Sequence, residues 1–227
     1  MRERFLSFFV VGVLTVIIFI FFFLYTQPIP APKIATSGSD IVTQKTPIVT
    51  FVNPSKGAAN PKLTLVVYSD FECPACKQLD QSIDIALKTF PNDVRVVWKD
   101  MPNDSTHIQA TPAAVAAHCA DRQGKFWEYA DELFHNQTLL SSSIYAQIAS
   151  NVSLNAEKFS KCFASGDTLP IVKKDFAEGQ ALGIAATPTI FIGDQSIVGF
   201  QTPDELIGAI KKQLSLQPSP QTHVPSK

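Results

Sequence analysis

The centre of the predicted fold is a buried strand that runs directly into an amphipathic helix. Leu63–Tyr68 is a short apolar run rich in branched residues with turn-forming residues on both sides, and this pattern is typical of a central strand. Beyond it, the apolar residues Leu79, Ile83 and Leu87 lie four positions apart, which predicts a helix with Pro74 in its first turn.

Other short apolar runs predict the strands of the same sheet. Val94–Trp98 would complete a strand–helix–strand unit, in which the two strands are parallel. Thr189–Ile192 and Ser196–Val198 are joined through Gly193-Asp194, a hairpin pattern. Ile48–Val52 is predicted as the first strand.

The segment of about residues 105–183 lies between these strands and has helical spacing throughout. A final helix is predicted to begin at Thr202 and Pro203, a capping residue followed by a proline. The chain is therefore expected to be an α/β protein with an inserted group of helices. The helices predicted for the insertion lie around residues 126–134, 144–148, 159–163 and 169–182.

The N-terminus is predicted to be a transmembrane anchor. Phe5–Tyr25 is an unbroken, almost wholly apolar run of 21 residues, and a helix of this length crosses a hydrocarbon core of roughly 30 Å. Arg2 and Arg4 precede the run and should stay in the cytoplasm. A cleaved signal peptide is the alternative, but its apolar region is usually shorter, about 7–15 residues. A buried core helix is a further alternative, which the run's apolar character on every face disfavours.

The amino-acid composition predicts the boundaries of the remaining segments of the chain. We expect residues 1–25 to form a cytoplasmic tip and the anchor, residues 26–46 a flexible linker rich in Pro, Ser and Thr, and residues 217–227 a disordered tail. Residues 47–216 would form one domain with one insertion. The formal net charge of −1 argues against a nucleic-acid partner.

Cys73 and Cys76 are the candidate reactive groups. Cys73 is predicted to be the N-cap of the helix that Pro74 begins, where free backbone N–H groups and the helix dipole favour a thiolate. Cys76 lies one turn further on and could attack a disulfide formed at Cys73. Two alternatives remain open, a structural disulfide and a zinc site that also uses His118 and Cys119.

Three segments resemble one family. Asp70–Cys76, which reads DFECPAC, resembles the active site of the DsbA-like thiol:disulfide oxidoreductases of bacterial envelopes, a branch of the thioredoxin superfamily. Ala113–Tyr129 is similar to the start of the helical domain inserted into their thioredoxin fold, and Ala186–Thr189 resembles a loop whose proline is cis. The resemblance spans about residues 48–214.

The resemblance implies a thioredoxin fold with an inserted helical domain, and an enzyme that needs no cofactor and cycles a Cys73–Cys76 disulfide. Pro74 and Ala75 would be the variable pair of the active-site motif. Thr187 and cis-Pro188 would pair with an extended substrate. An ordinary turn proline is the alternative for Pro188.

Cys119 and Cys162 fall on two helices of the insertion. Buried free cysteines are common in protein cores. An oxidising compartment favours a disulfide instead, and some relatives of the resembled family carry one in the helical domain. A bridge closing this 43-residue loop would stabilise the fold by about 4 kcal/mol on the chain-entropy model.

The implied function is oxidation of cysteine pairs in secreted or envelope proteins. Its partners would be unfolded secreted proteins with free thiols and a membrane reoxidase of DsbB or VKOR type. The location would be the bacterial cell membrane, with a single-pass anchor, a cytoplasmic N-terminus and the catalytic domain on the outer, periplasmic or extracellular face. The alternatives are an envelope disulfide reductase or isomerase and a non-catalytic binding module with a thioredoxin fold.

One position departs from the resembled pattern. Thioredoxin and many relatives carry a buried acid six residues before the first cysteine, and Val67 occupies that position here. Asp70 and Glu72 are nearby in sequence and are expected to be solvated. His107 and His118 are expected to be solvated or packed histidines, so the group that deprotonates Cys76 is unassigned.

Overall fold

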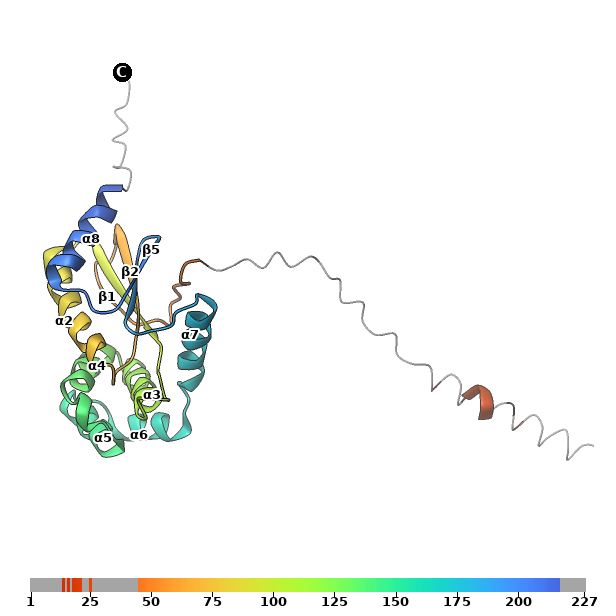
Figure 1. The fold of residues 1–227 in the computed structure, drawn as a ribbon. Coiled ribbons are helices and arrows are strands. Elements are labelled where there is room, and N and C mark those ends of the chain that lie inside the picture. Colours follow the sequence, from red (N-terminus) through yellow and green to blue (C-terminus); the bar gives the residue numbers. More distant parts are fainter. Residues whose placement is uncertain (1–13, 15, 17, 22–24, 26–44, 217–227) are drawn as a thin grey trace, which may run out of the picture. The chain divides into compact units, whose positions relative to one another are not determined.

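The structure is a computed structural model that describes residues 14, 16, 18–21, 25 and 45–216 (Figure 1). The chain divides into two units, Met1–Val42 and Thr43–Lys227. In the first unit the described residues are helical, and the ring centroids of Phe21 and Tyr25 lie 4.5 Å apart. Within the described part of the chain, no helix combines the length and the apolar character that a membrane crossing requires.

Three of the predicted segments are therefore largely or wholly outside the described residues. These are the transmembrane anchor within residues 1–25, the linker at 26–46 and the tail at 217–227. The fold described below is that of the second unit.

Five strands form one sheet in the order β1-β3-β2-β4-β5. At its centre, β2 (Leu63–Ser69) and β3 (Val94–Asp100) are parallel. On one side β1 (Ser55–Gly57) pairs antiparallel with β3. On the other, β4 (Thr189–Ile192) pairs antiparallel with β2, and β5 (Gln195–Val198) with β4. The parallel unit and the hairpin that the sequence predicts are both confirmed.

The strand predicted at Ile48–Val52 is wrong. Oδ1 of Asn53 accepts hydrogen bonds from the backbone N–H and the hydroxyl of Thr50, at 3.0 and 2.8 Å. The side-chain amide of Asn53 also donates to Asp175, at 3.2 Å from its nearer oxygen. These side-chain bonds hold the chain in a turn, so the ladder starts only at β1.

Helices cover both faces of the sheet (Figure 1). α2 (Pro74–Thr89) and α8 (Pro203–Leu216) pack on one face, and α7 (Leu169–Ala181) packs on the other. The alternation of β2 side chains fits this arrangement. Val67 belongs to the core beneath α2 and α8, whereas Tyr68 belongs to a smaller cluster on the α7 face.

The remaining helices form the insertion, which occupies the lower part of the domain in Figure 1. Together with α7, they fill the gap in sequence between β3 and β4. The helical insertion that the sequence predicts is confirmed. Its elements are α3 (Ala110–Asp121), α4 (Phe126–His135), the 3-10 turn η1 (Gln137–Leu139), α5 (Ser142–Asn151) and α6 (Ala156–Ser165).

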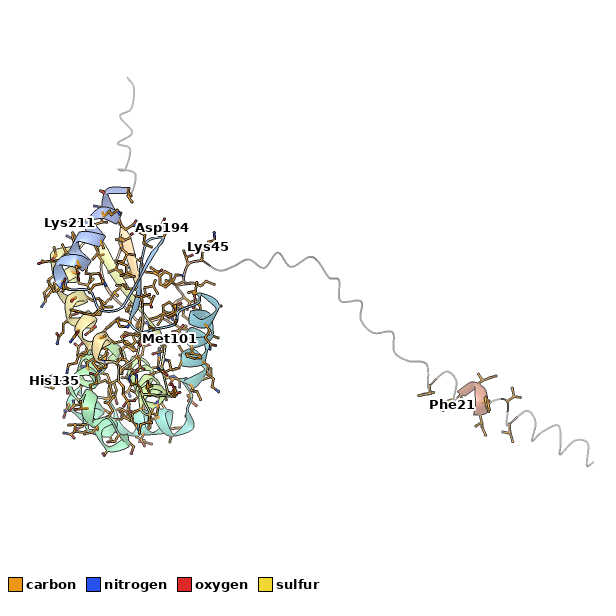
Figure 2. The ribbon with its side chains drawn as sticks, in the orientation of Figure 1. Phe21, Lys45, Met101, His135, Asp194 and Lys211 are labelled. Carbon is orange, nitrogen blue, oxygen red and sulfur yellow. A yellow bond between two sulfur atoms is a disulfide. The ribbon has the colours of Figure 1, made fainter. Side chains whose placement is uncertain are left out.

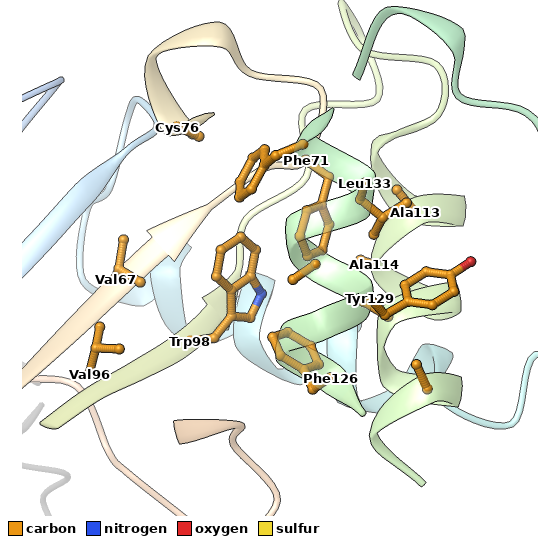
Figure 3. Packing of buried hydrophobic residues seen from close by; sticks show 14 of the residues in the cluster. Val67, Phe71, Cys76, Val96, Trp98, Ala113, Ala114, Phe126, Tyr129 and Leu133 are labelled. Atoms are coloured by element: carbon orange, nitrogen blue, oxygen red, sulfur yellow. The ribbon is translucent and has the colours of Figure 1, made fainter. Parts of the chain in front are cut away.

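Aromatic side chains join the insertion to the sheet (Figure 3). Phe71, just after β2, stacks on Trp98 of β3 with ring centroids 4.5 Å apart. Phe126 and Phe134 of α4 pack around this pair at 5.2 to 6.4 Å. One apolar core therefore runs from the sheet into the insertion, and it passes directly beneath the cysteine-bearing loop.

A disulfide holds two helices of the insertion together. Cys119 of α3 is bonded to Cys162 of α6, with Cα atoms 5.8 Å apart. α3 is buried on several sides, and alanines make up most of its buried residues, so neighbouring helices can approach it closely.

The α7 face of the sheet carries a buried ion network. Lys99 of β3 is 1% exposed, and its ammonium lies 2.8 Å from carboxylate oxygens of both Asp175 and Glu178. Met101, labelled in Figure 2, continues the chain beyond β3 on this side. A Cβ at Gly179 would lie only 2.6 Å from its sulfur, so the glycine allows α7 to approach the sheet.

Candidate active site

Cys73 occupies the N-cap of α2, as its spacing from Pro74 predicts. Its backbone is extended, with φ −77° and ψ 118°, and Pro74 lies in the first turn of the helix. The backbone N–H of Cys76 donates to Sγ of Cys73 at 3.4 Å. The sulfur thus takes the place that an oxygen occupies in an ordinary cap, at the positive end of the helix.

The pKa values of the two cysteines are shifted in opposite directions. A hydrogen bond from the Cys76 thiol lowers the pKa of Cys73, burial opposes this, and backbone N–H groups lower it further, to about 6. Burial raises the pKa of Cys76 well above its ordinary value, and the hydrogen bond and charge of Cys73 add to that rise. Near neutral pH the pair therefore holds one thiolate, on the sulfur nearer the surface.

The segment before β4 closes the site from the other side. The Thr187–Pro188 peptide bond is cis, and the carbonyl of Thr187 lies 3.5 Å from Sγ of Cys73. The carbonyl of Pro188 accepts a hydrogen bond from Gly199 at 2.7 Å, which ties this segment to the end of β5. The fold thus brings Cys73, Cys76, Thr187 and Pro188 together although more than 100 residues separate the two pairs.

Asp70 is buried, not solvated as predicted. Its side chain is 0% exposed. One carboxylate oxygen accepts from the N–H of Glu72 at 2.8 Å, and the other accepts from the N–H of Asn103 at 3.0 Å and lies 2.7 Å from Nδ1 of His107. Asp70 therefore joins the cysteine loop to the loop that follows β3.

Gln137 is a second link that the sequence does not reveal. Its side-chain amide, in η1, donates to the carbonyl of Phe71 at 2.7 Å and to that of Cys73 at 3.0 Å. Glu72 adds a third link, because its carboxylate accepts the N–H of Gln109. The insertion thus holds the backbone on which Cys73 sits. Each link joins residues at least 33 positions apart, so no local pattern could have indicated it.

Comparison with known proteins assigns this architecture. Residues 52–212 match the model of a thioredoxin family. The chain belongs to this thioredoxin family.

Curated relatives match this chain over a part of their own length. A Na(+)/H(+) antiporter NhaA 1 of Mycolicibacterium gilvum is 34% identical over 158 residues, which are 69% of this chain and 26% of that protein. The chain spans about a quarter of the length of the curated relatives it matches. The match covers only a part of that protein, so the antiporter's transport activity does not extend to this chain.

Solved structures share the fold over most of this chain. A periplasmic thioredoxin-like protein of Salmonella enterica serovar Typhimurium is 26% identical and has a TM-score of 0.60, over 72% of this chain and 91% of that chain. The thiol-disulfide exchange protein alpha-DsbA2 of Wolbachia pipientis, at 18% identity, shares the fold with a TM-score of 0.65, over 71% of this chain and 87% of that chain. The resemblance to the thioredoxin superfamily is confirmed, and a protein named as a DsbA shares the fold.

The position of the usual thioredoxin acid is apolar here. Val67 is buried and lies opposite Trp98 in the parallel ladder between β2 and β3. The nearest buried acid on the same ladder is Asp100, which pairs in register with Ser69. Asp100 accepts from the indole of Trp98 at 2.8 Å and lies 2.6 Å from Nε2 of His118.

His118 is a packed histidine, with a side chain that is 0% exposed. Burial lowers its pKa, but the neighbouring Asp100 carboxylate outweighs this and leaves the pKa raised. Its Nδ1 has no hydrogen-bond partner within the described part of the chain.

The neighbouring Cys119 is in a disulfide, so the zinc site considered with His118 and Cys119 is not formed. The described residues contain no group of three or more His, Cys, Asp or Glu placed to hold a metal ion.

Proposed function

We propose that this protein is a thiol:disulfide oxidoreductase that oxidises cysteine pairs of secreted or envelope proteins through a Cys73–Cys76 disulfide. The observation that carries the proposal is the asymmetry of the pair, a Cys73 thiol of pKa about 6 beside a Cys76 thiol of raised pKa. A low pKa at the attacked cysteine stabilises the reduced form, and a stable reduced form makes the disulfide oxidising.

The reaction follows from which sulfur can be reached. A substrate thiolate attacks Sγ of Cys73 and the Cys73–Cys76 bond breaks, so that Cys76 leaves as a thiolate and takes up a proton. A second substrate thiolate then attacks the substrate sulfur of the mixed disulfide, and Cys73 leaves as the thiolate that the N-terminus of α2 stabilises. The substrate loses two electrons and gains a disulfide, and the protein keeps those electrons as a dithiol.

The loop before β4 would position the substrate during this exchange. The backbone at Thr187, 3.5 Å from Sγ of Cys73, is suitable for pairing with an extended polypeptide. A membrane reoxidase of DsbB or VKOR type would then take the two electrons and restore the Cys73–Cys76 disulfide.

The place of this reaction is the outer face of a bacterial cell membrane. The apolar run Phe5–Tyr25, preceded by two arginines, supports a single-pass anchor with its N-terminus in the cytoplasm. The periplasmic location named for the Salmonella protein is consistent with an outward-facing domain. Membrane fractionation of the intact chain tests this, and a soluble form lacking about the first 25 residues would mean a cleaved signal instead.

The reduction potential tests the direction of electron flow. We expect a value above about −270 mV, the potential of thioredoxin, and near −150 mV. The full chain in detergent would be equilibrated with glutathione buffers and its thiols counted. A potential at or below that of thioredoxin would make the protein an envelope reductase. A Cys73 pKa near the ordinary value of about 8.5 would instead favour a binding module with an idle cysteine pair.

A further inference from the structure

A cavity opens next to Thr187, the residue whose carbonyl lies 3.5 Å from Sγ of Cys73. Its volume is about 680 Å³, and it lies between the loop after β3, the first half of α7 and the segment that leads to Pro188. Its apolar wall includes Met101, Val172 and Phe176, and its polar wall includes Asp104 and Lys173. Small-molecule and side-chain sites commonly have volumes of about 300–1,000 Å³ and mainly apolar linings.

The cavity is continuous with the site of disulfide exchange. Thr187, whose carbonyl lies 3.5 Å from Sγ of Cys73, is also part of the cavity wall, together with Ala185 and Ala186. A polypeptide that is bonded to Cys73 and paired along this segment would lie beside the cavity. In an extended polypeptide, alternate side chains point to the same side. One side chain near the reacting cysteine would therefore face the cavity.

The two charged groups at the cavity are not equivalent. Both carboxylate oxygens of Asp104 are already used, since they accept from the N–H and the hydroxyl of Thr111 at 3.0 and 2.7 Å. Lys173 is exposed and forms no ion pair or hydrogen bond with any other described residue. The ammonium of Lys173 is thus the charge that an incoming chain would meet.

We propose that this cavity is a specificity site for the substrate polypeptide. It takes an apolar side chain close to the reacting cysteine, and Lys173 pairs with an acidic side chain beside it. The proposal rests on the proposed function and specifies which substrate sequences the enzyme oxidises fastest, those with an apolar and an acidic side chain close to the cysteine.

Four synthetic peptides of equal length test the proposal with the full-length protein in its oxidised form. Each carries one cysteine flanked on both sides by leucine or by serine, and beyond these by glutamate or by lysine. The second-order rate of mixed-disulfide formation is measured for each peptide. Dividing it by the same peptide's rate with a small uncharged disulfide removes differences in thiol reactivity. We expect leucine to exceed serine by about tenfold, the effect of burying one apolar side chain, and glutamate to exceed lysine.

Matched variants locate the effect. Lys173→Glu should reverse the preference between glutamate and lysine, whereas Lys174→Glu, the same change at the next exposed position of α7, should leave it unchanged. Ala185→Trp, at an exposed cavity position, should remove the leucine preference, and Ala181→Trp, exposed at the end of α7, should keep it. Equal normalised rates for all four peptides, or equal effects of each variant and its control, would overturn the proposal.

Dithiothreitol separates this proposal from the proposed function. It is too small to need the cavity, so the oxidised protein should oxidise it whether or not the cavity selects peptides. Fast oxidation of dithiothreitol with no peptide preference overturns the specificity site alone. A protein that oxidises neither dithiothreitol nor the peptides overturns the proposed function, and the specificity site with it.

Discussion

Nδ1 of His107 lies 2.7 Å from a carboxylate oxygen of the buried Asp70. Asp70 immediately follows β2, and its own carbonyl accepts the N–H of Cys73 at 3.1 Å. His107 belongs to the loop between β3 and α3. This contact therefore places a titratable group of the second loop on the segment that shapes the active site.

The pair should make stability depend on pH. Burial lowers the pKa of His107, but the hydrogen bond and charge of Asp70 raise it by more than burial lowers it. In the folded protein the pKa of His107 therefore exceeds the ordinary value of 6.5. Protonation then favours the folded form. The contribution is fully present below about pH 6.5 and is lost as the pH rises through the higher folded-state value. Urea unfolding of wild type and His107→Gln should show a difference at pH 5.5 that shrinks by pH 8.5. A difference that grows with pH would contradict this assignment.

The elements that the sequence predicts well are those with a strong local period. The unit from Leu63 to Thr89 has a strand, a proline-marked helix start and a four-residue apolar repeat, and all three appear in the structure. Thr202 also caps α8, because it exchanges hydrogen bonds with Glu205. These features depend on residues within a few positions of one another.

The features that the sequence does not reveal depend on distant side chains. From the sequence alone, Asp70 is expected to be a solvated turn residue. In the structure its carboxylate contacts Asn103 and His107, which follow it by more than 30 positions. Ile48–Val52 has the composition of a strand, but the side chain of Asn53 holds a turn there. The ion network at Lys99 likewise needs α7, which is about 70 residues away. The hydrogen-bond partners of buried polar groups are set by tertiary position, and the periodicity of apolar residues along the sequence does not predict that position.

The Cys119–Cys162 disulfide should stabilise the insertion without taking part in exchange. Replacing both residues by alanine should lower the free energy of unfolding by about 4 kcal/mol, because the unfolded chain would no longer contain a closed 43-residue loop. The rate of dithiothreitol oxidation at 25 °C should stay within about twofold of wild type, since neither sulfur touches the Cys73–Cys76 pair. Denaturant titration and a turnover assay measure the two quantities. Loss of turnover in a variant that remains folded would assign the bridge a part in the reaction.

Replacing Lys99 should lower the free energy of unfolding more than replacing most other polar residues. Lys99→Ala would remove the ammonium that lies 2.8 Å from the buried carboxylate of Asp175 and from that of Glu178, and removing one member of a buried ion pair costs about 3–5 kcal/mol. Denaturant titration measures the loss. Arg122→Ala is the control, because the Arg122–Asp167 pair is about half exposed (48% and 49%) and should matter far less. Equal effects of the two substitutions would mean that water reaches the Lys99 network.

Gln137 should position the cysteine loop without contacting the reacting sulfurs. Gln137→Ala removes two hydrogen bonds to the carbonyls of Phe71 and Cys73, each worth roughly 1 kcal/mol. We expect a modest loss of stability and, in addition, faster amide hydrogen exchange in residues 71–77 than elsewhere in the domain. Gln123→Ala serves as the control, because it also removes two hydrogen bonds to backbone groups, the carbonyl and the N–H of Asn155, at an exposed position. Unchanged exchange at the loop in Gln137→Ala would show that the insertion does not hold it.

The Cys73 thiol should titrate near pH 6, and this gives the reduced protein a pH dependence of the opposite sign to that of His107. Because its folded-state pKa of about 6 is below the ordinary value of about 8.5, ionisation favours the folded form. The contribution is present above the unfolded-state value and is lost as the pH falls through about 6. The stability of reduced wild type relative to Cys73→Ser should therefore rise between pH 5 and pH 8. The rate of iodoacetamide alkylation at Cys73 should follow the same midpoint, while Cys76 stays unmodified. An alkylation midpoint near the ordinary value of about 8.5 would mean that neither the Cys76 thiol nor the N-terminus of α2 stabilises the thiolate, and the proposed direction of electron flow would lose its physical basis.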